Sequence, residues 1–368
     1  MPFEKGNLTF RICRLPEAMP QNTVELFAQN AAGSLEGVMD EPQWGWVTPR
    51  HLLDTNITED AIKMNGYYHI CLRQAQRKIP ASLLSAECRI AELSKMAEMG
   101  VDHLAKKERK AIKEEVTKHL LPQMPPQLAG TYCVIDTAEN LLFTTAVSSH
   151  AFEIFAAWFL KTIGFEPIPL TPEVASASLF NIDGTTIPAL CISPALNRKD
   201  GEGNGTLGEN FLTWLWYYQE ARGGMLPQSK LGSFGLMIDG PLSFIAEGAG
   251  AFESVVRKGT PTLSAEAKAA LMVGKKLKSA KFILAQDKNV EWSCTLDANE
   301  FVFRGLKLPE GEAMDPLGIF EERMTNLYTF HSVFFGLFQK FLTEMADSEK
   351  ANAYREKARE WISNHEER

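Results

Sequence analysis

The sequence is poor in cysteine, and its few cysteines are spaced too widely for a metal-binding or redox motif. No C-x-x-C pair occurs, and no spacing of Cys and His completes a zinc knuckle. We therefore interpret the cysteines as reduced core residues of a cytosolic protein. They lie at positions 13, 71, 88, 133, 191 and 294.

Long apolar runs are also missing. No window reaches the roughly 18 to 20 uncharged apolar residues that a membrane-spanning helix requires, and the N-terminal stretch MPFEKGNLTFRICRL lacks the apolar centre of a signal peptide. We expect neither export nor membrane insertion, and hence a cytoplasmic protein without a membrane partner.

Catalytic motifs are absent as well. The sequence has no G-x-S-x-G elbow, no Walker loop, no H-E-x-x-H and no G-x-G-x-x-G after a strand. The acidic pairs Glu114–Glu115 and Glu321–Glu322 are adjacent in sequence, so their carboxylates do not share the helix face that a two-metal nuclease site would need. We expect a protein that is not an enzyme and that uses no cofactor or metal.

The composition that is present is that of a globular protein. Of the 368 residues, 45% are apolar and 23% are charged, which suffices for two or three hydrophobic cores. Acidic residues outnumber lysine and arginine by 46 to 38, which gives a formal charge of −8. A chain of this charge does not coat nucleic acid over its whole surface, so any polyanion site must be local.

Apolar periodicity predicts an α+β fold whose first half contains a helical hairpin between strand-rich segments. Pro80 and Gly100 bound the first helix of the hairpin, and Pro122 follows the second. The predicted strands lie at 8–15, 44–49, 67–73 and on both sides of a bend at 137–140, and the predicted helices at 21–32, 80–100, 106–121 and 150–164.

The second half begins with weak periodicity and ends in helices. We expect a mobile loop in the glycine-rich piece at 197–209 and a helix capped by Ser264. The predicted strands lie at 280–285, 290–296 and 300–307, and the predicted helices at 265–273, 320–342 and 348–364.

The stretch KKERKAIKEEVTKHLLPQMPP at 106–126 is basic in an acidic chain. On a helical wheel, Lys106, Lys110 and Lys113 lie on one line, whereas Glu108 and Glu115 point the other way. This segregation favours contact with a polyanion.

The alternative is an ordinary solvated helix face. Glu114 lies near Lys107 and Lys118 on the wheel, and pairs such as Glu114 with Lys118 are common surface features. The pattern alone leaves both interpretations open.

Two further basic clusters add candidate contacts. Residues 267–286 contain five lysines and no acid, so they create a positive local potential that attracts phosphate. A lysine-rich edge strand that discourages aggregation is the alternative. Lys107 joins Lys106, Lys110 and Lys113 as a candidate DNA-binding residue. The other candidates are Arg73, Arg77, Lys78, Arg257, Lys258, Lys268, Lys275, Lys276, Lys278 and Lys281.

The run FLTWLWYY at 211–218 contains five aromatic residues. Such a run can stack on the bases of single-stranded nucleic acid, although a buried helix or strand is the more common explanation.

Several segments in a fixed order resemble the recombination-associated protein RdgC family. None is diagnostic by itself, but together they cover most of 1–170 and 260–342. The segments are WGWVTP at 44–49, ICLRQAQRKIPASLL at 70–84, AKKERKAIKEEVTKHLLP at 105–122, VIDTAENLL at 134–142, PIPL at 167–170, LSAEAKAALMVGKKLKSAKFIL at 263–284 and FEERMTNLYTFHSVFFGLFQKFL at 320–342.

The resemblance implies a non-enzymatic protein of DNA recombination and replication. Members form a homodimeric ring that encircles duplex DNA without reading its sequence and restrains RecA, so the expected partners are double-stranded DNA, single-stranded DNA as a further ligand, and a second copy of the chain. A nucleoid-associated location follows. The resemblance also implies a central α+β domain at 1–78 and 127–170, a tip hairpin at 79–126 and a base region at 171–368.

Two departures stand out. Gln123 and Met124 follow Leu120-Leu121-Pro122 where family members carry an aromatic residue, so the tip contact is expected to close differently. Residues 171–256 match poorly and look like an addition of unknown role. A protein-interaction scaffold, in which the aromatic run and the C-terminal helices bind a partner chain, is the alternative function.

Overall fold

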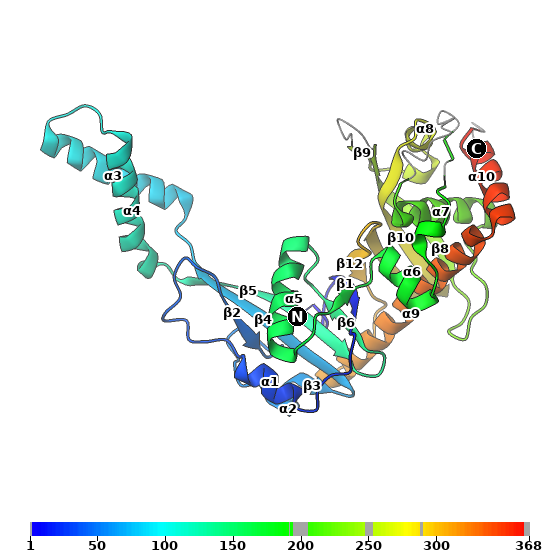
Figure 1. Cartoon of the computed structure of the whole chain (residues 1–368), viewed down its shortest axis with the longest axis horizontal. Coiled ribbons are helices and arrows are strands. Elements are labelled where there is room, and N and C mark those ends of the chain that lie inside the picture. The colour runs from blue at the N-terminus through cyan, green and yellow to red at the C-terminus, as the bar shows by residue number, and fades with distance from the viewer. Residues whose placement is uncertain (1, 191, 194–204, 247–252, 288–289, 364–368) are drawn as a thin grey trace. The chain divides into compact units, whose positions relative to one another are not determined.

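A computed structural model describes residues 2–190, 192–193, 205–246, 253–287 and 290–363 of the chain (Figure 1). Two compact units are present, and they are described separately below. The first comprises 1–16, 140–152 and 167–368, and the second comprises 17–139 and 153–166. Of the loop expected at 197–209, residues 197–204 lie outside the described residues, and 205–209 lead into a helix.

The second unit is built on an antiparallel sheet with the order β2-β4-β5 and the short β3 beside β4. The long strands β4 and β5 pair along their whole length, from Tyr67 opposite Asp136 to Arg77 opposite Pro126. The elements are β2 (Gln43–Val47), β3 (Lys63–Met64), β4 (Tyr67–Arg77), β5 (Pro126–Asp136), α1 (Thr23–Gln29) and α2 (Glu59–Ile62).

Trp46 is the centre of this unit's core. Its ring lies 4.9 Å from Phe27 and 6.0 Å from Phe155, and its indole Nε1 donates a hydrogen bond of 2.7 Å to Oγ1 of Thr162. Phe155 and Thr162 belong to α5 (Ser149–Ile163), which ends at Gly164 as predicted. Burial of the tryptophan with its polar atom satisfied fixes α5 against the sheet.

The helical hairpin projects from the ends of β4 and β5 (Figure 1). Its helices are α3 (Ala81–Met99) and α4 (Lys106–Leu120), followed by a single 3-10 turn, η1 (Leu121–Gln123). Gly100 adopts a left-handed φ of 64°, which ends α3, and Glu108 accepts a hydrogen bond of 2.8 Å from the backbone N of Ala105, which caps α4. The sequence prediction of both helices is confirmed.

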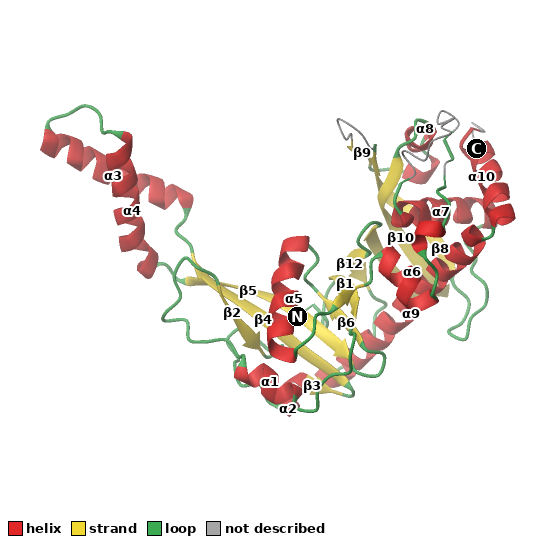
Figure 2. Ribbon diagram, in the orientation of Figure 1, coloured by secondary structure: helices red, strands yellow, loops and turns green. Residues whose placement is uncertain are grey.

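The first unit has a larger antiparallel sheet with the order β6-β1-β12-β11-β10-β8-β9, and β7 also pairs with β1 (Figure 2). One face of β8 and β10 is buried, because Leu236, Ile238, Phe282 and Leu284 alternate with more exposed residues. The strands are β1 (Leu8–Arg14), β6 (Leu141–Thr144), β7 (Ile168–Pro169), β8 (Gly235–Ile245), β9 (Glu253–Val256), β10 (Lys276–Asp287), β11 (Val290–Asp297) and β12 (Val302–Lys307).

Helices of this unit carry its aromatic core. The ring centroids of Phe334 and Phe303 lie 4.9 Å apart, and those of Phe338 and Phe211 lie 5.0 Å apart. The long helix that carries Phe334 and Phe338 therefore packs against both the sheet and the aromatic run. The helices are α6 (Pro172–Phe180), α7 (Leu207–Arg222), α8 (Ala265–Met272), α9 (Pro316–Ala346) and α10 (Ser348–Ser363), with 3-10 turns η2 (Gly184–Thr186) and η3 (Pro261–Leu263).

The predicted α+β class is confirmed, with some boundaries shifted. β10 starts four residues before the predicted strand, and α9 starts earlier because Asp315 accepts a hydrogen bond of 2.9 Å from the N of Gly318 and Pro316 suits the first turn. None of the described helices combines the length and the apolar character needed to cross a bilayer.

The cysteine prediction is confirmed for most of the positions described. Cys13, Cys71, Cys133 and Cys294 are buried thiols, and burial raises the pKa of Cys13 and of Cys71 to about 12. Cys88 is free but only half-buried, and position 191 lies outside the described residues.

Candidate nucleic-acid interface

Helix α4 presents a cationic face to solvent. The side chains of Lys106, Lys107, Lys110 and Lys113 are all exposed, as the helical wheel predicted for this face. Lys110 and Lys113 border a groove of about 700 Å³, together with Thr117. The cations are therefore accessible to a polyanion.

The floor and far wall of this groove come from outside α4. Leu121 and Pro122 of η1 line it, and Met39 and Asp40 border it from the loop before β2. Asp40 is acidic, whereas α4 contributes three lysines and the single acidic residue Glu114, so the cationic side of the groove is the α4 side.

Two acidic residues of α4 lie away from this groove, as predicted, whereas Glu114 borders it beside Lys110 and Lys113. Glu115 lines a separate groove against α3, and Glu108 is used in the helix cap. Glu114 pairs with Lys110 at 3.6 Å, and not with Lys118, the partner named for the alternative of a solvated helix face. Both partners are mostly exposed, and such a pair contributes little to stability.

The sequence prediction missed Lys118 as a groove residue. Its exposed side chain borders the same groove as Lys110 and Lys113, and no partner is found for it among the described residues. The spacing to Glu114 suggested an ion pair; only the position of the loop at 39–40 reveals that Lys118 faces the groove.

Arg73 is buried and does not belong to the exposed cationic surface. It is 4% exposed, and its guanidinium donates hydrogen bonds to the carbonyls of Gly33 (2.6 Å) and Leu52 (3.3 Å). Burial lowers the pKa of Arg73. Because this side chain holds two loops against β4, its predicted contact with DNA is not supported by its position.

Arg77 is a positioning residue, while its neighbour Lys78 is exposed. Nε of Arg77 donates to the carbonyl of Val38 at 2.8 Å, and Nη1 donates to the carbonyls of Pro122 (3.3 Å) and Met124. Arg77 thereby ties the loop at 38–40 to the end of the hairpin, and these are the two segments that form the groove opposite α4.

The basic segment of the first unit is only partly accessible. Arg257 and Lys258, which follow β9, are exposed, and Lys278 is half-buried without a partner among the described residues. Lys275 donates to Oγ of Ser254, and Lys281 pairs with Asp239 at 3.0 Å. Segregation of charge is therefore weaker here than on α4.

Two lysines of this segment are held by their surroundings. Nζ of Lys268 lies over the ring of Trp361, 5.6 Å from its centroid. Lys276 is 8% exposed and packs beside Gly205, next to the carboxylate of Glu209. The predicted DNA contact of Lys276 is thus corrected, because a buried ammonium cannot reach a phosphate.

The aromatic run is also inaccessible. Trp214 and Trp216 are fully buried, while Tyr217 and Tyr218 are 9% and 3% exposed. These residues lie in α7, which packs on β8 and β10, so the run forms no open aromatic surface in the described structure, and only Tyr217 and Tyr218 at its end border a pocket.

Comparison with known proteins places residues 10–180 in a family described as "Putative exonuclease, RdgC". A relative named "Recombination-associated protein RdgC" from Serratia proteamaculans is 28% identical over 165 residues, which cover 44% of this chain and 53% of the relative. The protein of that name from Edwardsiella ictaluri is 29% identical over 194 residues, covering 51% and 63%. The chain thus spans roughly half of the length of such curated relatives.

The fold and the candidate site define an α+β protein with a basic helical hairpin. The match to the RdgC family covers residues 10–180 and contains the whole hairpin. The resemblance found in the sequence is confirmed. No group of three or more His, Cys, Asp or Glu side chains able to hold a metal gathers within the described ranges.

Proposed function

We propose that this protein binds duplex DNA through its sugar-phosphate backbone, without reading the base sequence, and acts in recombination by limiting the access of RecA to DNA. The observation that carries the proposal is the exposed cationic face of α4 inside the family-matched region. Flexible lysines suit phosphate contacts and do not themselves select a base. Single-stranded DNA, which carries the same phosphates, is a second expected ligand.

The salt dependence of binding tests the electrostatic part of this proposal. If about six phosphates are neutralised, the logarithm of the binding constant should fall with the logarithm of the salt concentration with a slope of about −5, since each contact contributes about −0.9. Flat salt dependence, or no DNA shift at low salt, would refute backbone binding.

Charge reversal on α4 locates the contact. Changing Lys110→Glu and Lys113→Glu together should reduce the salt slope by about 2 and weaken binding to all duplex sequences alike. The control is Lys63→Glu with Lys161→Glu, two exposed lysines of the same unit outside the groove; Lys63 pairs with Glu59 and Lys161 lies over the ring of Trp158. An equal loss in both double variants would show only a general effect of net charge.

We further propose that two copies of the chain pair through α3. This helix of nineteen residues has no buried residue in the single chain, and its apolar side chains Ile90, Leu93 and Met99 are 62%, 47% and 50% exposed. Ile90 and Leu93 are three residues apart and so share one face of α3, and exposed apolar clusters mark interfaces in soluble proteins. A dimer closed at a second contact would retain DNA by topology as well as by charge.

Mass in solution tests the dimer. Ile90→Glu with Leu93→Glu should convert a dimer into monomers in sedimentation or light scattering, because paired copies would have to bury the introduced carboxylates. The control Ser82→Glu with Ser85→Glu adds the same charge at the other end of α3. A mass of one chain in the unmodified protein would reject pairing.

Catalysis is not part of the proposed function. Glu322 accepts hydrogen bonds from the N of Glu312 (3.2 Å) and of Ala313 (3.1 Å), and Glu114 pairs with Lys110, so one member of each acidic pair has a partner within the chain. The wording "exonuclease" in the family description makes a direct test essential. End-labelled linear duplex DNA incubated with the protein and Mg²⁺ or Mn²⁺ should stay intact. A DNA-shortening activity that copurifies with the protein would overturn the proposal that it is not a nuclease.

The alternative of a protein-interaction scaffold loses its main support. It rested on the aromatic run and the C-terminal helices as docking surfaces, and the aromatic run is buried in α7. Nucleoid association is proposed as the consequence of DNA binding.

A further inference from the structure

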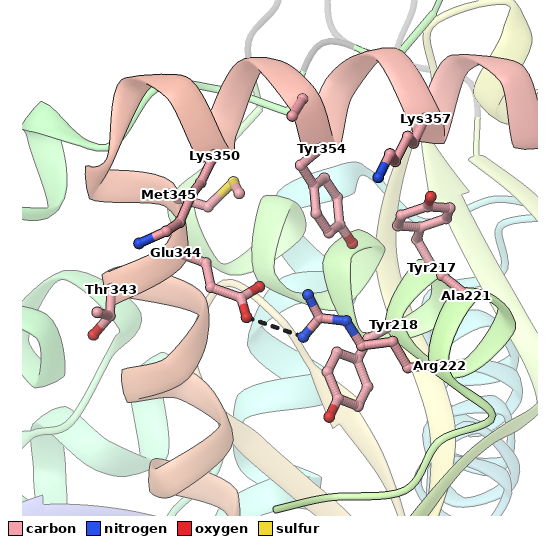
Figure 3. Close-up of a pocket in the computed structure, with 11 residues that line it drawn as sticks. Tyr217, Tyr218, Ala221, Arg222, Thr343, Glu344, Met345, Lys350, Tyr354 and Lys357 are labelled. Carbon is pink, nitrogen blue, oxygen red and sulfur yellow. Dashed lines mark hydrogen bonds and ion pairs between the residues drawn. The ribbon is translucent and has the colours of Figure 1, made fainter.

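A pocket of about 600 Å³ opens between α7, the end of α9 and the first half of α10 in the first unit (Figure 3). It lies beyond residue 180, outside the part of the chain that matches the family. Its volume falls within the usual range for small-molecule sites. The lining combines aromatic side chains with cations.

The floor of the pocket is formed by tyrosines. Tyr217 of α7 and Tyr354 of α10 meet edge to face with ring centroids 4.8 Å apart, and the hydroxyl of Tyr354 donates to the carbonyl of Trp214 at 2.9 Å. Tyr218 is fixed in the same way by a 2.9 Å hydrogen bond to the carbonyl of Met225. The rings are therefore held rigidly, which a flat ligand ring requires of its support.

Arg222 supplies a positioned cation. Its guanidinium lies over the ring of Tyr218, 5.1 Å from the centroid, and its Nη1 donates to Oε1 of Glu344 at 3.0 Å (Figure 3). About half of the Arg222 side chain is exposed. A guanidinium has five N–H donors, so this ion pair leaves others for an anion in the pocket.

The carboxylate of Glu344 does not repel an anion strongly. Oε1 of Glu344 is also bound by Nζ of Lys340 at 2.9 Å, so two cations offset its charge. Lys350, on the opposite rim, pairs with Asp347 at 2.9 Å and contributes less.

Lys357 is an exposed cation at the opening of the pocket. Its exposed side chain has no partner in the part of the chain that the structure describes, and it stands at the same end of the pocket as the hydroxyl of Tyr217 (Figure 3). Burial and the charge of Glu360 raise the pKa of Tyr217, so its hydroxyl stays protonated and can donate to an anion.

From this arrangement we propose that the pocket binds a nucleoside monophosphate, with the phosphate held by Arg222 and Lys357 and the base packed beside the Tyr217–Tyr354 pair. A dianion matches the two cations that line the pocket, and a planar base matches its tyrosine rings. The ligand is either a free nucleotide or the phosphorylated end of a DNA strand. This site does not depend on the proposed duplex binding by α4.

Calorimetric titration of the full chain with adenosine 5′-monophosphate tests the site. We expect saturable binding, and at least tenfold weaker binding of both adenosine and inorganic phosphate, because each offers only half of the matching chemistry. No heat or equal affinity for phosphate alone would overturn the proposal.

Two variants tie binding to the pocket. Lys357→Glu should weaken binding of the nucleotide at least tenfold, whereas Lys230→Glu, an equal charge change at an exposed lysine outside the pocket, should leave it within twofold. Ala353→Trp fills the pocket from exposed α10 without changing charge and should abolish binding. Unchanged affinity in Lys357→Glu and Ala353→Trp would overturn the assignment.

Competition identifies the source of the ligand. A single-stranded oligonucleotide with a 5′-phosphate should displace the nucleotide better than the same strand with a 5′-hydroxyl if the pocket holds strand ends. Displacement by neither strand, with binding still lost in Ala353→Trp, supports a site for free nucleotide.

Discussion

His331 makes the first unit sensitive to acid. It is 8% exposed on α9, surrounded by the rings of Tyr328 at 5.1 Å, Phe143 at 5.8 Å and Phe335 at 6.4 Å. Burial lowers the pKa of His331 from 6.5 to about 4. The folded state therefore keeps the imidazole neutral at pH values where the unfolded chain binds a proton.

The size of the stability loss at acid pH follows from the linkage between proton binding and folding. Above pH 6.5 both states are neutral at this position and nothing changes; as the pH falls below 6.5, the unfolded state gains protons and stability falls until the folded pKa is reached. With the pKa of His331 lowered to about 4, the loss is about 2 kcal/mol at pH 5 and approaches about 3 kcal/mol near pH 4.

Urea unfolding at pH 8 and at pH 5, with and without His331→Phe, measures this effect. The free energy of unfolding should fall between the two pH values by about 2 kcal/mol more in the unmodified chain than in the variant. His331→Gln serves as a second variant that keeps a polar side chain. His69 and the carboxyl groups titrate in all three proteins and cancel in the difference. An identical pH dependence in all three would refute the reasoning.

Two stability predictions use matched pairs of substitutions. A Cβ at Gly208 would lie 1.9 Å from the carbonyl oxygen of Ala298, so Gly208→Ala should destabilise the first unit by about 2 to 3 kcal/mol in urea unfolding. Gly336 lies on α9 with open space around it, so Gly336→Ala should stabilise the unit by about 0.5 to 1 kcal/mol. Arg77→Lys cannot reproduce the three carbonyl contacts and should cost about 2 kcal/mol, while Lys78→Ala should stay within about 0.5 kcal/mol. Equal effects within either pair would contradict the contacts described.

Element positions could be read from the sequence because they depend on local signals. Pro80, Gly100 and Pro122 bound the hairpin helices, and Ser264 caps α8 through a hydrogen bond to the N of Glu266. The wheel also placed Glu115 correctly, because the side of a helix on which a residue lies follows from its spacing.

Side-chain burial within the basic clusters could not be predicted in the same way. Arg73 is covered by loops around Gly33 and Leu52, and Lys276 packs beside Gly205, all distant in sequence. Lysine and arginine are rarely buried, so a pattern of positive charge was reasonably interpreted as surface. Only the tertiary contacts separate cations that hold loops from cations that face solvent.

The poorly matched segment is not an appendage, although the sequence suggested an addition of unknown role. Phe211 of α7 packs against Phe301 at 6.0 Å and Phe338 at 5.0 Å, so this helix supplies part of the hydrophobic centre of its unit. Because the buried half of α7 anchors the helix, Tyr217 and Arg222 at its other end are held in fixed positions. Rigid support of this kind is what a binding site needs, and it makes the C-terminal end of α7 the place where this chain can differ functionally from the relatives it resembles.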